Sequence, residues 1–272
     1  MKREKVKNKT FLNYLIFFFR IVSIIIIVIC LYILYLWDQD NRKNNTIQSE
    51  LSDTYVSIDS ISEEIEPFTP IYTDAVDENG ISIEQFDVDF NLLAQKNPDS
   101  LAWIRILDTN ISYPIVQTTD NDFYLTHNIE KQKNGAGWIY ADYRNNFESL
   151  DKNIIIYGHN RRNGTMFSNL QYYLDENFCA NPNHKYFNFI TKSTKYLAEV
   201  FSVYKISSNK VDLPNTFTTL TDFEETINGW KNNSIYDFQT DINLSDNILS
   251  LYTCDNNTSY RIILHAKLIP LK

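Results

Sequence analysis

The sequence predicts a mainly β domain with added helices, built as a barrel or a sandwich. Two observations carry this prediction. Short runs rich in β-branched and aromatic residues recur from residue 103 to residue 268 and are separated by polar turns. Stretches with helical spacing of apolar residues interrupt these runs, and a hydrophobic fraction of 43% in 272 residues is enough for a folded core.

The first element is an N-terminal membrane anchor. Five of the first nine residues are basic, and they precede an apolar stretch from Phe11 to Trp37 whose only charged residue is Arg20. About 20 apolar residues cross a bilayer, and a basic flank stays in the cytoplasm. We therefore expect a cytoplasmic tail over residues 1–10, a transmembrane signal anchor over residues 11–37 and an extracellular remainder. A cleaved signal peptide fits less well, because the apolar part is too long for one.

A stalk follows the anchor and leads to the folded domain. Residues 38–80 are polar and acidic, and we expect them to form an extracellular linker before a folded domain over residues 81–272. Within the linker, Ile58, Ile61 and Ile65 have the spacing of one amphipathic turn that could pack on the domain.

The expected domain starts with a helical pattern over residues 86–97 and continues as eight short strands. Two helical insertions are expected, over Met166–Asn177 and Asp222–Asn232, the second with an N-cap signal at Thr221. The expected strands are Trp103–Leu107, Ile111–Val116, Gly137–Tyr140, Asn153–Tyr157, Lys185–Ile190, Tyr196–Tyr204, Ile248–Tyr252 and Arg261–Leu268.

Charge and cysteine usage exclude several classes of protein. The net charge is −9, and residues 1–20 carry six basic residues and one acidic residue, so the remainder is strongly acidic and no nucleic-acid partner is expected. Three cysteines, Cys30, Cys179 and Cys254, are too few for a disulfide scaffold. The four histidines are scattered and no Cys-x-x-Cys pair occurs, so we expect neither a metal site nor a cofactor.

The first candidate for chemistry is a hairpin near the C-terminus. Cys254 ends one apolar run and Arg261 opens the next, with six polar residues between them. In the simplest antiparallel register these two residues face each other and project from the same side of the sheet. A guanidinium near a thiol favours the thiolate and can donate to a developing oxyanion. The alternative is a buried cysteine beside a surface arginine.

The second candidate is a histidine at a strand exit. The run Asn153–Tyr157 ends at Gly158 and places His159 at the start of a polar loop, where an imidazole can accept and donate protons near neutral pH. His127, His184 and His265 lack this setting, so we rank His159 first.

The residues around these candidates resemble the sortases, which are membrane-anchored cysteine transpeptidases of Gram-positive cell surfaces. The carriers are Tyr157-Gly158-His159-Asn160, Thr253-Cys254 and Arg261, in the order and spacing of that family. The class is identified as B from further motifs, namely Asn97-Pro98-Asp99, Trp103-Ile104, Ile111–Gln117, Asp120-Asn121, Tyr124-Leu125, Gly137–Arg144 and the helix at Asp222–Asn232. The resemblance covers residues 81–272 and implies an eight-stranded sortase-type β-barrel with an N-terminal helix and a helical insertion before the last strand pair.

The resemblance also implies a reaction and its partners. Cys254 would attack the carbonyl of a threonine in an Asn-Pro-x-Thr-like sorting signal near the C-terminus of a secreted protein, and a peptidoglycan-precursor amine of the lipid II type would resolve the thioacyl enzyme. His159 would move the protons and Arg261 would hold the oxyanion. Tyr252 and Thr253 are candidate substrate contacts, and Tyr252 stands where class B members commonly have serine, which bears on the signal that is read.

Two other functions stay open at this stage. One is an L,D-transpeptidase or cysteine endopeptidase acting on peptidoglycan, although the Gly-Cys-x-Arg arrangement of the former is absent around Cys254. The other is a non-catalytic membrane-anchored binding module in which Cys254 is part of the core. We interpret Cys179 as a packed thiol at a helix end and Asp255 as a solvated loop acid.

Overall fold

The computed structural model describes residues 2–58, 86–254 and 259–271, with the side chains of residues 2–12, 57, 58 and 254 outside the described part. The chain forms two compact units, Met1–Lys43 and Asn44–Lys272. Helix α1 (Lys2–Tyr55) contains the expected anchor and is long and apolar enough to cross a membrane. The expected linker over residues 38–80 stays a prediction, and its first part, through Tyr55, is helical. The amphipathic turn expected at Ile58, Ile61 and Ile65 falls on residues outside the described part.

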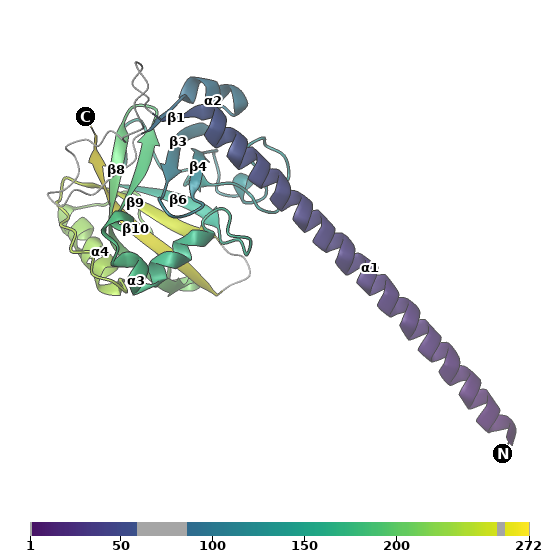
Figure 1. The fold of residues 1–272 in the computed structure, drawn as a ribbon. Helices are drawn as coiled ribbons and strands as arrows, with labels where there is room; N and C mark the ends of the chain where they lie inside the picture. Colours follow the sequence, from purple (N-terminus) through teal and green to yellow (C-terminus); the bar gives the residue numbers. More distant parts are fainter. Residues whose placement is uncertain (1, 59–85, 255–258, 272) are drawn as a thin grey trace. The chain divides into compact units, whose positions relative to one another are not determined.

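The second unit is built on a closed eight-stranded barrel, which confirms the predicted fold class (Figure 1). The strand order is β10-β8-β7-β3-β4-β5-β6-β9, with β4–β5 and β6–β9 parallel and the other neighbours antiparallel. The strands are β3 (Ser100–Arg105), β4 (Ser112–Val116), β5 (Tyr140–Ala141), β6 (Asn153–His159), β7 (Tyr186–Thr191), β8 (Lys195–Ser207), β9 (Asn247–Cys254) and β10 (Tyr260–Pro270).

All eight expected strands are present in the expected order, with bounds that differ most from the prediction in β5. The strand expected at Gly137–Tyr140 starts only at Tyr140, because Gly137 has a φ of +59° and belongs to a turn. Outside the barrel, β1 (Val56–Ile58) pairs with β2 (Phe86–Val88).

Three expected helices differ in detail from the prediction. The helical pattern from residue 86 is split, because Phe86 lies in β2 and helix α2 covers Phe90–Lys96 with Asp89 as its N-cap. The stretch Met166–Asn177 is a 3₁₀ helix, η2 (Ser168–Leu174), followed by α3 (Glu176–Cys179). The remaining short 3₁₀ helices are η1 (Phe123–Leu125), η3 (Pro182–Lys185) and η4 (Ser208–Lys210).

The helical insertion between β8 and β9 is α4 (Leu220–Asn233). Its N-cap is Thr219, whose side chain accepts from the Asp222 N–H at 3.0 Å, and not Thr221 as the sequence suggested. The helix therefore begins at Leu220, two residues earlier than expected, and Thr221 lies in its first turn.

Two hydrophobic cores lie on opposite sides of the barrel wall. Side chains that alternate along β6, β9 and β10, such as Ile154, Leu249 and Leu264, fill the barrel interior. Their neighbours Ile155, Ile248 and Ile263 point outward and pack under α4. The outer core is completed by Phe201, Tyr204, Leu213, Phe223, Ile227 and Trp230. Helix α4 thus covers the outer face of the strands that end at the candidate site.

Candidate functional site

The three candidate catalytic residues fall in one row across three neighbouring strands. His159 is the register partner of Cys254 in the parallel pair β6–β9. In the antiparallel pair β9–β10, the register ends at Tyr252 opposite Ile263, and Cys254 and Arg261 each lie two residues beyond this last pair on their strands. Neighbouring strands are about 4.8 Å apart, so the row spans roughly 10 Å with the cysteine in the middle.

Strand alternation puts His159 and Arg261 on the outer face of the barrel. Ile155 of β6, Ile248 of β9 and Ile263 of β10 belong to the outer core under α4. His159 and Arg261 are an even number of residues from Ile155 and Ile263 along their strands, so both occupy outward-facing positions. The structure therefore brings the main chain of all three residues to one edge of one face, while the side chain of Cys254 lies outside the described part.

The imidazole of His159 is oriented by a main-chain carbonyl. Its Nε2 lies 2.8 Å from the oxygen of Leu125, and because a carbonyl only accepts, Nε2 carries the proton. In the neutral ring Nδ1 is then the basic nitrogen. The ring is half-buried, so it keeps access to solvent and substrate.

Two glycines make room for this arrangement. A Cβ on Gly158 would lie 2.5 Å from Ile139 Cδ1 and 2.7 Å from the ring of Phe167, so only glycine fits immediately before His159. A Cβ on Gly137 would lie 3.0 Å from His159 Cδ2. The backbone of this turn therefore packs directly against the imidazole.

The other histidines are engaged in structural contacts. His127 stacks on Phe123, with ring centroids 4.1 Å apart. His184 is buried, and its Nδ1 donates to the carbonyl of Phe178 at 2.8 Å. His265 is fully buried in the outer core between hydrogen-bond partners and the ring of Trp230, and burial holds its pKa well below the ordinary value. The ranking of His159 as the histidine available for chemistry stays a prediction.

Cys179 is a packed thiol. Cys179 is a free, buried thiol whose Sγ–H donates to the Tyr173 carbonyl at 3.1 Å, and burial raises its pKa to about 11. A packed, protonated thiol of this kind is a poor nucleophile.

Arg261 is only partly buried, and its Nη1 donates to the carbonyl of Tyr260. Asp255 lies outside the described residues.

The two expected substrate contacts lie on opposite sides of β9. Tyr252 is on the outer face, half-buried, with its ring edge-on to Tyr157 at 5.3 Å between centroids. The side chain of Thr253 is 2% exposed, and its Oγ1 accepts from the Ile262 N–H at 2.9 Å. Thr253 is therefore buried in the absence of a substrate, and both substrate contacts stay predictions.

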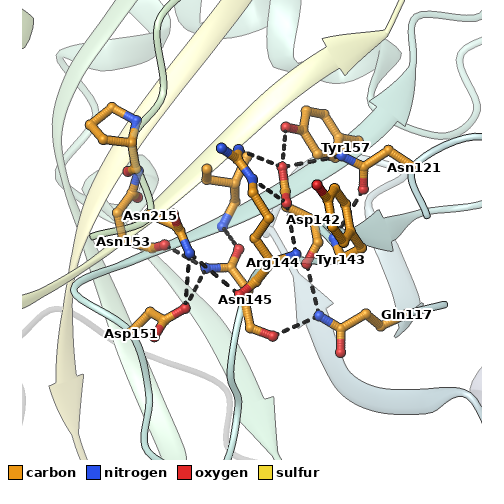
Figure 2. Close-up of polar contacts among 12 residues, drawn as sticks. Gln117, Asn121, Asp142, Tyr143, Arg144, Asn145, Asp151, Asn153, Tyr157 and Asn215 are labelled. Carbon is orange, nitrogen blue, oxygen red and sulfur yellow. Dashed lines mark hydrogen bonds and ion pairs between the residues drawn. The ribbon is translucent and has the colours of Figure 1, made fainter. Parts of the chain in front are cut away.

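Tyr157 is held by a buried carboxylate (Figure 2). Its hydroxyl donates to Asp142 Oδ2 at 2.7 Å, and the same carboxylate accepts two bonds of 2.8 Å from Nε and Nη2 of Arg144. Asn121 adds a contact of 3.2 Å. Burial alone would raise the pKa of Asp142, but the hydrogen bonds of Arg144 and Tyr157 outweigh it and lower that pKa to about 2. The carboxylate is therefore ionised at neutral pH.

A second part of the network in Figure 2 fixes the start of β6. The amide of Asn145 donates to the carbonyl of Asn153 and accepts from the Ile155 N–H, each at 2.7 Å. Gln117 Nε2 donates to the carbonyls of Asp142 and Asn145 at 2.8 Å. These hydrogen bonds connect the loop that contains Asn145 to the start of β6.

A cavity of about 360 Å³ opens next to Tyr252. Its walls are Tyr252 and Tyr157 on the strands, Arg144 on the loop and the segment 208–213 that leads toward α4. Because Arg144 is paired with Asp142, the strand side of the cavity is aromatic and close to electrically neutral.

Sequence reasoning missed Tyr157, Asp142 and Leu125 as parts of the site. Strand alternation gives a signal for Tyr157, which is two residues before His159 and therefore on the same face. The carbonyl of Leu125 leaves no trace in the side-chain pattern, and Asp142 is far from the other residues in sequence.

Comparisons with known proteins agree with this geometry. Residues 104–269 match the family described as the sortase domain. Sortase B of Listeria monocytogenes is 40% identical over 180 residues, which are 65% of this chain and 72% of that protein. A Bacillus anthracis protein described as similar to sortase B superposes with a TM-score of 0.70 at 30% identity, over 85% of this chain and 98% of that one. A Staphylococcus aureus sortase B–substrate complex gives 0.65 at 31% identity, over 67% and 85%.

Proposed function

This chain belongs to the sortase family of cysteine transpeptidases and within it to class B, and from this premise we propose that Cys254, His159 and Arg261 carry its chemistry. What supports the assignment is that His159 is the register partner of Cys254 and that Arg261 lies near the start of β10, the strand next to β9. With the cysteine in the middle, one acyl group above it is within reach of both flanking side chains.

The first half-reaction forms a thioacyl enzyme. The thiolate of Cys254 attacks the carbonyl carbon of a threonine, and the guanidinium of Arg261 donates to the resulting oxyanion. The C–N bond then breaks, and the imidazolium of His159 gives its proton to the departing amine. The hydrogen bond from Nε2 to Leu125 fixes the ring, so Nδ1 is the nitrogen that exchanges the proton.

The second half-reaction transfers the acyl group. An amine of a peptidoglycan precursor of the lipid II type attacks the thioester, His159 removes its proton, and the C–S bond breaks to regenerate the thiolate. The donor is a secreted protein with a C-terminal Asn-Pro-x-Thr-like signal. We place Tyr252 and the adjoining cavity against the residues that precede the threonine, because aromatic walls suit an apolar or proline side chain.

The proposed location is the outer face of the cell membrane. Helix α1 crosses the bilayer once with its basic end in the cytoplasm, and the second unit acts outside. Both the sorting signal and the precursor amine are available at that surface.

The test is product analysis with the full chain in detergent micelles. A labelled Asn-Pro-x-Thr peptide is incubated with an amine acceptor, and we expect cleavage after threonine and transfer to the amine. Cys254→Ala abolishes both, and Cys179→Ala serves as the matched control that keeps them. Equal cleavage by Cys254→Ala contradicts the proposal. Release of muropeptides from peptidoglycan favours the peptidoglycan-acting enzyme instead, and a Cys254 thiol that resists alkylation favours a binding module.

A further inference from the structure

The last turns of α1 pack against the barrel within the second compact unit. Ile47, Leu51 and Tyr55 recur at four-residue spacing and are buried. Asn44 and Gln48 have the same spacing and lie beside this apolar stripe. Both polar side chains bind groups in the loops that surround His159, although neither is near that residue in sequence.

Gln48 reaches His159 through a tyrosine. Its Nε2 donates to the Asn110 carbonyl at 2.8 Å, and its Oε1 accepts from the Tyr113 hydroxyl at 2.8 Å. The same hydroxyl oxygen accepts from the Met166 N–H at 3.0 Å. Tyr113 is buried, and burial raises the pKa of its hydroxyl, so it remains a proton donor to Gln48.

Met166 is the point where this relay meets the catalytic strand. It has a φ of +57°, a left-handed conformation that a methionine keeps only when its surroundings hold it. Met166 forms a β-bridge with Asn160, and the next residue, Phe167, donates its N–H to the carbonyl of His159 at 3.0 Å. The bond from Met166 to Tyr113 therefore holds the segment that fixes the backbone of His159.

Asn44 binds the turn whose backbone lies next to the imidazole of His159. It accepts from Asn134 Nδ2 at 3.0 Å and donates from Nδ2 to the Gly137 carbonyl at 3.4 Å. Gly137 is the residue whose backbone packs on the ring of His159. Its turn also contacts the carbonyl of Leu125, to which His159 Nε2 donates.

We propose that Asn44 and Gln48 are positioning residues, Gln48 for the backbone of His159 through Tyr113 and Met166 and Asn44 for its ring through Gly137, so that the end of α1 is part of the catalytic apparatus. The proposal rests on the proposed role of His159 in proton transfer. Neither side chain touches the reacting atoms. Their loss therefore misplaces the imidazole and lowers kcat, while the groove that binds the peptide, and hence KM, is unchanged.

The test uses the full chain and substitutions of similar size. Gln48→Met and Asn44→Leu remove the hydrogen bonds and keep the volume, and Tyr113→Phe removes only the hydroxyl. We expect each to lower kcat about 10- to 100-fold, the size of effect that misplacement of a catalytic group produces, and to shift the pH profile of kcat/KM. Because Gln48 and Tyr113 act in one relay, the double variant Gln48→Met/Tyr113→Phe costs less than the product of the two single effects.

Glu50→Gln is the matched control on the same helix. It weakens the ion pair with Lys96, at 3.5 Å, and leads to no contact with His159 in the described residues. We expect its kcat and pH profile to equal those of the parent.

Two results overturn the inference in distinguishable ways. If Gln48→Met, Asn44→Leu and Tyr113→Phe lower the melting temperature and leave kcat and the pH profile unchanged while His159→Ala is inactive, the end of α1 has a structural role only and the proposed function stands. If His159→Ala keeps full activity, the proposed function fails and the inference fails with it.

Discussion

The two walls of the site are held by different forces. On the His159 side, the contacts are uncharged. His159 Nε2 donates to the Leu125 carbonyl, the backbone of Gly137 lies against the imidazole, and the ring of Phe167 lies next to Gly158. On the Tyr157 side, a buried carboxylate and the guanidinium of Arg144 hold the aromatic ring. The first wall depends on shape and the second on charge. Substitutions on the first are therefore expected to lower turnover as well as stability, and those on the second are expected to affect stability and substrate choice.

The largest effect is expected from His159→Ala. Removing the proton carrier eliminates general acid–base catalysis in both half-reactions, and we expect kcat to fall by at least about 10³-fold. Single-turnover kinetics with the labelled peptide measure this. His184→Gln is the control, because His184 is buried against Phe178 and is expected to affect folding stability only. Comparable losses in the two variants would remove the distinction between them.

Gly158→Ala tests the packing on the first wall. The added Cβ overlaps with Ile139 and Phe167, so we expect a loss of about 1–3 kcal/mol in the free energy of unfolding together with a clear fall in kcat. Gly229→Ala is the matched control in α4, where a Cβ meets nothing within 4 Å, and it should stabilise the chain by about 0.5–1 kcal/mol. Urea denaturation compares the two variants. A Gly158→Ala variant as stable and active as the parent would show that the wall is loosely packed.

Asp142→Asn tests the charged wall. The carboxyl has a pKa of about 2 in the folded chain and about 3.9 in the unfolded chain, so its ionised form stabilises the fold by on the order of 2 kcal/mol at neutral pH. This contribution is complete above about pH 4 and is lost as the pH falls toward 2. Denaturation at pH 7 and at pH 3 should show a smaller pH dependence in Asp142→Asn than in the parent. Equal pH dependence would mean that the Arg144 pair contributes nothing net.

Tyr252→Ser is expected to have the smallest effect. It removes one aromatic wall of the cavity and leaves the row of catalytic residues in place, so we expect a change of several-fold in kcat/KM among peptides that differ before the threonine. Peptide-library profiling measures the change, and the rate of Cys254 alkylation should stay the same. An unchanged profile would exclude Tyr252 from substrate selection.

Much of the barrel could be predicted because its strands are local patterns of β-branched and aromatic residues. The antiparallel pairing of β9 with β10 could be predicted from a hairpin, in which the register depends on nearby residues only. The packing of residues 44–55 could not be predicted, because Gln48 binds Asn110 and Tyr113 more than 60 residues away. The left-handed backbone conformation of Met166 could not be predicted from the sequence either, since that conformation is unusual for its residue type and is imposed by tertiary contacts.

Mass spectrometry of the covalent intermediate tests the central assignment most directly. The full chain is mixed with the sorting peptide, quenched in acid within one turnover and digested. We expect the fragment containing Cys254 to gain the mass of the peptide up to its threonine, hydroxylamine to release that mass, and Cys179→Ala to behave like the parent. An adduct on any other residue, or turnover without an adduct on Cys254, would contradict the assignment.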